Sequence, residues 1–156
     1  MKCYIDSSVF LHLLLEGDRA DEAEEILERV ENGEVTGYIT VLVAEEVAFK
    51  LLVAKASELG VDEFWSFKKR FLKDSEFRGK CYEPIMEFRE YLDKMAGLVW
   101  VPVADREYWE ALKIVRKYGL LTVDAIHAAT ALKLGVPLAS FDEDFKRVDF
   151  LEVMKI

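Results

Sequence analysis

Acidic residues recur in this sequence at points where a short apolar run gives way to a helical pattern. One follows the first apolar run, a pair comes shortly after the second, another opens a helical pattern, and the last follows a late apolar run. These residues are Asp6, Glu45 with Glu46, Asp124 and Asp142. In an open parallel sheet the carboxyl ends of the strands form the edge where ligands bind. Carboxylates gathered there repel one another unless a cation neutralises them, and oxygen ligands favour Mg²⁺ or Mn²⁺. Such a cation can activate water for attack on a phosphodiester, so the pattern predicts a hydrolytic metal site.

Structural roles compete with this interpretation, because 30 of the 156 residues are acidic. Asp124 is also suited to the first turn of a helix, and Asp142 to a turn, without any catalytic role. Asp6 is harder to explain in that way, since it directly follows a hydrophobic strand. The histidines His12 and His127 are interpreted as packing residues.

The elements that would carry these residues alternate along the chain, which predicts an α/β fold with a mainly parallel sheet. Short runs rich in β-branched or aromatic residues predict strands at Lys2 to Ile5, Gly37 to Thr40, Leu98 to Val103, Pro137 to Phe141 and Phe150 to Met154. Apolar residues at helical spacing predict helices at Asp18 to Glu31, Leu42 to Ala56, Asp105 to Tyr118 and Val123 to Leu134.

The stretch from Val61 to Ala96 has no strand pattern and predicts two further helices, broken near Gly79 and Pro84. No stretch has the composition of a linker, and no repeat is visible. We therefore expect residues 1–156 to form a single domain, with 61–96 as a helical arm within it. The arm is rich in apolar and aromatic residues, which suggests a surface for a partner.

Composition limits the possible functions. The net charge of −9 argues against a general electrostatic grip on a polyanion, so any nucleic-acid role must be locally organised. The high charged fraction, with Asn32 as the single asparagine and no glutamine, suggests a thermophilic source. Cys3 and Cys81 have no metal or disulfide spacing and are expected to be buried. Without an apolar run of membrane-spanning length or a secretory signal, we expect a cytoplasmic protein that does not contact membranes.

Four segments of the sequence resemble the PIN-domain family, and within it the VapC-like toxin ribonucleases. They are Tyr4 to Phe10, Ile39 to Ala48, Leu121 to Ala129 and Leu138 to Phe145. Each is weak alone, but together they follow the order of the family's motifs. The resemblance implies a three-layer α/β/α fold around a twisted parallel sheet.

The resemblance also implies a function and a set of site residues. The function is Mg²⁺- or Mn²⁺-dependent cleavage of single-stranded or structured RNA, by the toxin of a toxin–antitoxin pair. The resemblance further implies that the protein forms a homodimer and has an antitoxin protein as a partner. The four acidic positions of the family match Asp6, Glu46, Asp124 and Asp142, with Asp144 as a further metal-binding acid. Ser7 and Ser8 match a small polar position, and Ser140 is suited to orient Asp6. Glu46 suits the family register better than Glu45, although helical periodicity alone does not separate them.

Two other functions stay open. A phosphotransfer α/β domain would use Asp6 as its acceptor or nucleophile, but a haloacid-dehalogenase-like site needs a second Asp where Ser8 stands. A catalytically silent PIN-like scaffold would bind RNA or protein without needing all four acids.

Overall fold

The computed structural model describes residues 1–156 and divides the chain into two compact units. Unit 1 comprises Met1–Ala44 and Met95–Ile156, and unit 2 comprises Glu45–Lys94. Unit 2 is thus larger than the arm expected at 61–96, because it also takes in most of α3 (Val41–Glu58). None of the helices combines the length and apolar character needed to cross a membrane.

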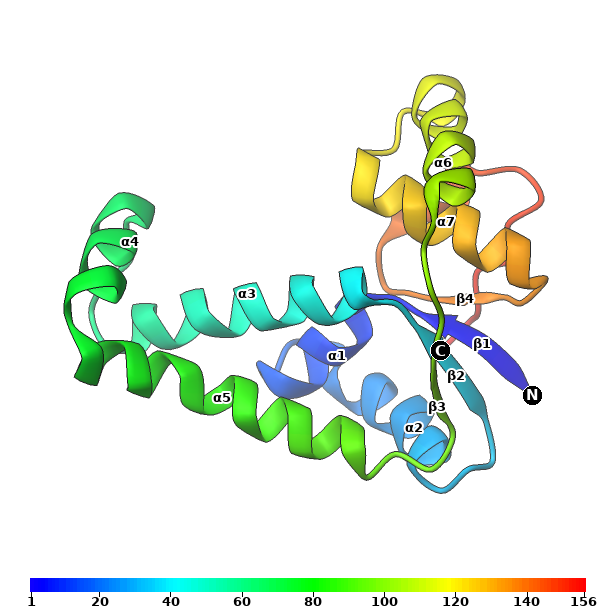
Figure 1. Cartoon of the computed structure of the whole chain (residues 1–156). Helices are drawn as coiled ribbons and strands as arrows, with labels where there is room; N and C mark the ends of the chain where they lie inside the picture. The colour runs from blue at the N-terminus through cyan, green and yellow to red at the C-terminus, as the bar shows by residue number, and fades with distance from the viewer. The chain divides into compact units, whose positions relative to one another are not determined.

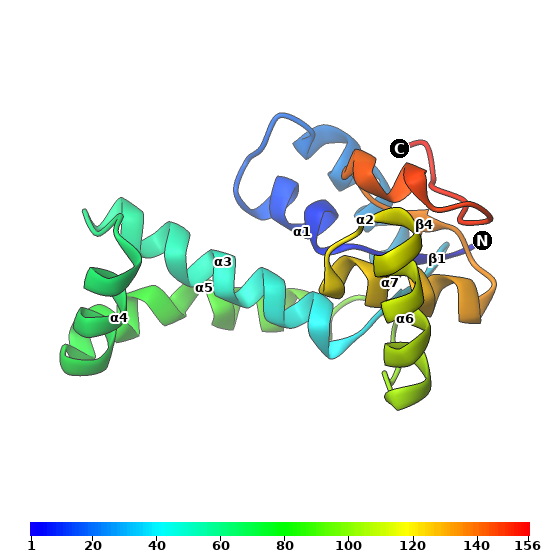
Figure 2. The same cartoon turned by 90° about the horizontal axis from the view of Figure 1, so that it is seen from above.

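Unit 1 is built on a four-stranded parallel sheet with the strand order β3-β2-β1-β4. The strands are β1 (Lys2–Ile5), β2 (Thr36–Ile39), β3 (Leu98–Trp100) and β4 (Leu138–Ala139). Helices α1 (Ser7–Leu14) and α2 (Ala20–Glu31) cover one face, and α6 (Asp105–Tyr118) and α7 (Thr122–Leu134) cover the other (Figure 1, Figure 2). The predicted α/β class with a parallel sheet is confirmed.

The strand order places β1 inside the sheet, with β2 on one side and β4 on the other. Cys3, Tyr4 and Ile5 are completely buried, as expected for a central strand covered on both faces. The chain builds outward from β1 through β2 to β3 and then returns to the opposite side of β1. Ligands of open α/β sheets bind at the carboxyl ends of the strands where the order reverses in this way. That position is the edge formed by the ends of β1 and β4.

One predicted strand is wrong, because residues from Phe150 to Met154 form a single isolated bridge between Val153 and Leu138. Phe150, the first residue of the predicted strand, has a φ of 68° and an exposed fraction of 94%, so no strand starts there. The neighbouring β4 is also only two residues long and gives little to pair with.

The sequence patterns do not predict two of the elements of unit 1. Helix α1 is apolar on most sides and shows no helical alternation, while its start is capped by Asp6, whose side chain accepts from the Ser8 amide. A short 3-10 helix, η1 (Glu143–Arg147), follows β4 and buries Phe145 completely.

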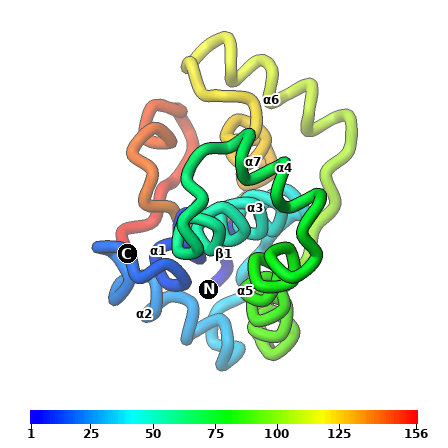
Figure 3. Tube along the Cα trace, turned by 90° about the vertical axis from the view of Figure 1, so that its left-hand side faces the viewer, coloured from blue at the N-terminus to red at the C-terminus, as the bar shows by residue number.

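Unit 2 contains the greater part of α3 together with α4 (Phe64–Lys73) and α5 (Ser75–Asp93), whose backbone course is traced in Figure 3. One hydrophobic core cluster of the unit consists of Ala56, Phe67, Phe77 and Cys81. Both cysteines of the chain are buried free thiols, as expected, and burial raises the pKa of Cys3 to about 11.

The two helices predicted in the arm are present, but the break between them is at Asp74 and not near Gly79 or Pro84, which both lie inside α5. Asp74 has extended backbone angles, and its carboxylate accepts from the Phe77 amide (3.0 Å). This hydrogen bond, as the largest cause, lowers the pKa of Asp74. Aspartate is a favoured residue at the start of a helix, which accounts for the start of α5 directly after Asp74.

Candidate active site

The carboxyl ends of β1 and β4 bring two predicted site residues together. Asp6 directly follows β1 and Ser140 directly follows β4, and the Asp6 amide donates to the Ala139 carbonyl (3.0 Å). Asp6 and Ser140 are 3% and 6% exposed, so the carboxylate of Asp6 is almost fully removed from water. A buried carboxylate needs hydrogen bonds or a cation to compensate for its lost hydration.

Hydrogen-bond donors hold the Asp6 carboxylate from one side. Ser140 Oγ donates to Asp6 Oδ2 (2.8 Å), and the Ser8 amide donates to the same oxygen (3.4 Å). The Ser8 hydroxyl lies 3.3 Å from Ser140 Oγ and accepts from the Phe141 amide (3.1 Å). Both bonds to the carboxylate end on Oδ2 and neither uses Oδ1. The group is therefore fixed in orientation with one oxygen left for another ligand, and an oxygen donor of this kind suits Mg²⁺ or Mn²⁺.

Asp142 and Asp144 follow on the same loop. The Asp142 amide donates to Ser140 Oγ (3.0 Å), so the backbone of Asp142 shares the hydroxyl that binds Asp6. The Asp142 carboxylate is half-buried and accepts from the Asp144 amide (2.9 Å) at the start of η1. Asp144 is exposed and lies 3.5 Å from Arg147. The structure thus places Asp6 and Asp142 at one edge of the sheet, with Asp144 one step further out.

Helix α7 carries Asp124 in its first turn and His127 three residues later, on the same face of the helix. Asp124 is half-buried and His127 is completely buried. A ring nitrogen of His127 and a carboxylate oxygen of Asp6 lie within 4.8 Å of one another. His127, in the second turn of α7, therefore lies next to the end of β1, while the place of Asp124 in the site stays a prediction.

A buried polar network lies behind this edge. His127 Nδ1 is 2.7 Å from the Tyr4 hydroxyl, which is also 3.1 Å from Thr40 Oγ1. Thr40 Oγ1 in turn accepts from the Val43 amide (3.4 Å) and so supports the start of α3. The network ties β1, the end of β2 and α7 together, and the side chains of Tyr4, Thr40 and His127 are completely buried.

The proton order in this network sets the role of His127. If Tyr4 donates to Nδ1, the neutral ring carries its proton on Nε2, which then acts as a donor. If Nδ1 donates to Tyr4, Nε2 has a lone pair and can bind a cation, as metal-binding histidines do when their other nitrogen is held by an acceptor. His127 is completely buried and has a specific hydrogen-bond partner in the Tyr4 hydroxyl, so its role in packing rather than in the site stays a prediction.

The fourth predicted carboxylate, Glu46, belongs to unit 2. It lies in α3, which begins directly after Thr40 at the end of β2. Glu46 is half-buried, whereas the neighbouring Glu45 is exposed.

The sequence patterns give Tyr4 and Thr40 no role in the site, although the signal of Thr40 is present. A threonine directly before a helical pattern is a capping residue, and Thr40 stands directly before α3. The two serines of the small polar position differ in the structure. Ser7 is buried at the first position of α1, and the hydroxyl that reaches the loop after β4 is that of Ser8.

The fold and this edge define a class of protein: a parallel α/β domain with a buried carboxylate at the point where the strand order reverses, and further acids beside it. A family model described as the PIN domain matches residues 3–151. The chain belongs to the PIN-domain family.

Known relatives agree with this assignment. Ribonuclease VapC6 of Methanocaldococcus jannaschii is 36% identical over an alignment 157 residues long, which covers 97% of this chain and 95% of that protein. Ribonuclease VapC2 of the same organism is 30% identical over 158 residues, covering 99% and 94%. Among solved structures, a toxin–antitoxin complex from Klebsiella pneumoniae has a TM-score of 0.62 and 18% identity, covering 98% of this chain and 96% of that chain. At that identity the likeness concerns the fold.

Proposed function

We propose that this protein is a metal-dependent endoribonuclease that cleaves single-stranded or structured RNA, and that it is the toxin of a VapBC-type toxin–antitoxin pair. The observation that carries the proposal is the buried Asp6 carboxylate, fixed by Ser140 at the reversal of the strand order. The full-length similarity to two VapC ribonucleases supports the same reaction class.

We assign the cation-binding role to Asp6, Glu46, Asp124 and Asp142, with Asp144 as an outer acid. Oxygen ligands of this kind fit Mg²⁺ or Mn²⁺. When bound, such a cation supplies an activated water and stabilises charge on phosphate oxygens.

The residues of the chain contribute orientation. Ser140 and the Ser8 amide hold Oδ2 of Asp6, so that Oδ1 keeps a fixed direction. The backbone of Asp142 is tied to the same Ser140 hydroxyl, which couples the two acids. The hydrogen bond between Tyr4 and His127 fixes α7 against β1 and thereby the position of Asp124. Preorganisation of this kind is what a phosphodiester hydrolase requires of its protein groups.

An RNA cleavage assay tests the proposal. Labelled single-stranded and hairpin RNAs are incubated with the purified protein in Mn²⁺, in Mg²⁺ and in a chelator. We expect cleavage only with metal, and its loss in Asp142→Asn but not in Asp105→Asn, an exposed acid at the start of α6. Binding of RNA without metal-dependent cleavage would favour the silent scaffold, and transfer of a phosphoryl group to Asp6 would favour the phosphotransfer domain.

We also propose that unit 2 contributes to a protein interface, either with an antitoxin or in a homodimer. Phe64, Trp65 and Leu72 on α4 are 47%, 68% and 75% exposed, although Phe67 on the same helix belongs to the core of the unit. Exposed apolar residues grouped on one helix mark interaction surfaces.

A further inference from the structure

A cavity of about 570 Å³ adjoins Asp142 within unit 1. One part of its wall is the loop after β4, including Ser140 and Asp142. Other parts present three cationic side chains, those of Arg19, Lys146 and Lys155, together with one more acid, Glu143. An anion that extends from the proposed active site into this cavity would therefore meet positive charge, which is otherwise in deficit on a chain of net charge −9.

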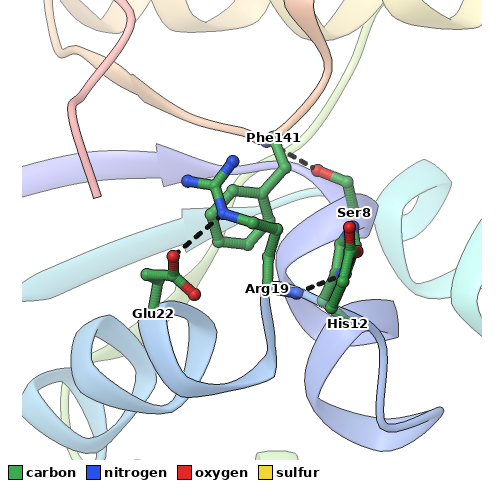
Figure 4. A network of polar contacts seen from close by, with 6 residues as sticks. Ser8, His12, Arg19, Glu22 and Phe141 are labelled. Carbon is green, nitrogen blue, oxygen red and sulfur yellow. Dashed lines mark hydrogen bonds and ion pairs between the residues drawn. The ribbon is translucent and has the colours of Figure 1, made fainter.

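Arg19 is the cation whose position is fixed most completely. Its Nε donates to Glu22 Oε1 (3.1 Å), and its guanidinium carbon lies 4.6 Å from the centre of the Phe141 ring. Its backbone amide donates to His12 Nδ1 (3.3 Å), and the His12 ring meets the Phe141 ring edge-on at 5.1 Å. Figure 4 shows this arrangement around the Phe141 ring.

These contacts leave most of the guanidinium available. An arginine has five N–H donors, and the bond to Glu22 uses the one on Nε. In Figure 4 the two terminal nitrogens of Arg19 point away from Glu22. The side chain is 40% exposed, so these donors can be reached from the cavity. A planar pair of N–H groups matches two oxygens of a phosphate.

Phe141 connects this group to the proposed active site, because it stands between Ser140 and Asp142 in the chain. Its amide donates to Ser8 Oγ (3.1 Å), the hydroxyl that also contacts Ser140. The stack of Arg19 on Phe141 thus fixes the guanidinium beside the residue that separates Ser140 from Asp142. Lys146 is less free for an anion, since it is paired with Glu143 at 2.6 Å.

We propose that Arg19 binds a phosphodiester of the RNA that flanks the cleaved phosphodiester on the same strand. Phe141 and Glu22 are its positioning residues. This inference rests on the proposed ribonuclease function and specifies where the strand leaves the site. Arg19 contacts the backbone and not a base, so its contribution is independent of RNA sequence.

Binding measurements test the role of Arg19. A fluorescent single-stranded RNA is titrated with the cleavage-deficient Asp6→Asn protein in Mg²⁺ at several salt concentrations, with and without Arg19→Ala. We expect the affinity to fall roughly tenfold, as for one charge-assisted contact. The slope of log K against log salt should become shallower by about 0.7, the value for one phosphate contact on a single strand. In the otherwise wild-type protein, KM for RNA cleavage should rise by a similar factor.

Arg29→Ala is the matched control. Arg29 lies on α2, the helix that starts directly after Arg19, and like Arg19 it pairs with an acid through Nε, 3.7 Å from Glu34 Oε2. Its side chain is 45% exposed, but it does not line this cavity. We expect the Arg29→Ala protein to bind RNA as the parent protein does. Arg19→Lys keeps the charge and separates loss of the contact from loss of folding: the salt slope should remain while part of the affinity is lost.

Equal affinity and salt slope in the Arg19→Ala and Arg29→Ala proteins would overturn the inference, and if the wild type still cleaves RNA the proposed function survives. A wild-type protein that neither binds nor cleaves RNA in Mn²⁺ would instead overturn the proposed function itself.

Discussion

Replacing Asp6 by asparagine should separate its proposed catalytic role from its structural one. In the structure the Asp6 carboxylate caps α1 and accepts from Ser140 at 2.8 Å. The amide oxygen of asparagine can accept the same two hydrogen bonds, and asparagine is about as good a helix cap as aspartate. Without metal, Asp6→Asn should therefore change the free energy of unfolding by less than about 0.5 kcal/mol, or raise it through relief of repulsion among the acids.

Alanine at the same position removes the acceptor of both hydrogen bonds. The lost cap costs about 0.5–2 kcal/mol. The buried Ser140 hydroxyl also loses its acceptor, at a cost of about 1–3 kcal/mol. Ser8 Oγ lies 3.3 Å from Ser140 Oγ and can take over that hydrogen bond in part, so the total cost of Asp6→Ala should be about 2 kcal/mol.

Metal then distinguishes the variants. A cation at about 100 times its Kd stabilises the wild type by about 2.7 kcal/mol, and both variants should gain less. Urea unfolding in chelator and in Mn²⁺, beside an RNA cleavage assay, measures both effects. Asp74→Asn is the matched control, because Asp74 caps α5 in the same way but lies in unit 2. It should keep the full metal response and full cleavage.

The result that would refute this reasoning is an Asp6→Asn protein that is as unstable as Asp6→Ala and still cleaves RNA in Mn²⁺. Asp6 would then be a helix cap, and the assignment of a cation site to it would fail.

Glu46→Gln should abolish metal-dependent RNA cleavage while Glu45→Gln leaves it intact, and the reverse result would show the register choice to be wrong. The contact with Lys133, as the largest cause, lowers the pKa of Glu107 to about 2. Ionised Glu107 therefore stabilises the fold at pH values above the pKa of the unfolded chain, 4.5, and this stabilisation is lost as the pH falls toward 2. In urea unfolding, the Glu107→Gln protein should be less stable than the wild type at pH 7 and equally stable near pH 2. Light scattering should show a dimer at micromolar concentration that Trp65→Ser weakens, and a monomeric wild type would count against the homodimer.

The sheet and its acidic edge can be predicted from the sequence because they depend on local patterns. A buried central strand such as β1 is apolar over most of its length, and a charged residue follows its end. The sequence therefore shows that Asp6 lies at the carboxyl end of a strand. The sequence also predicts α6 with its observed bounds, since its apolar stripe ends at a glycine, Gly119, in the left-handed conformation.

The parts that the sequence does not predict depend on contacts between distant segments. Helix α1 buries Val9, Phe10 and Leu11 in succession, so no apolar stripe is visible. The Ser140–Asp6 and Tyr4–His127 hydrogen bonds join residues 134 and 123 positions apart. The first follows from the pairing of Ile5 with Ala139, a register that the sequence does not state.

The negative net charge of the chain is compatible with an RNA substrate if a few basic side chains are fixed in position near the site. With 30 acidic and 21 basic residues, the whole chain repels RNA at long range. Most of the basic side chains that form ion pairs are paired with an acid one helical turn away, as Lys113 is with Glu110. Their charge is therefore locally neutralised, and they do not form a general basic surface. Affinity must then come from a bound divalent cation and from a few fixed donors such as Arg19. Because each phosphate contact on a single strand adds about 0.7 to the salt slope, such a protein should show a shallow dependence on salt and a steep dependence on divalent metal.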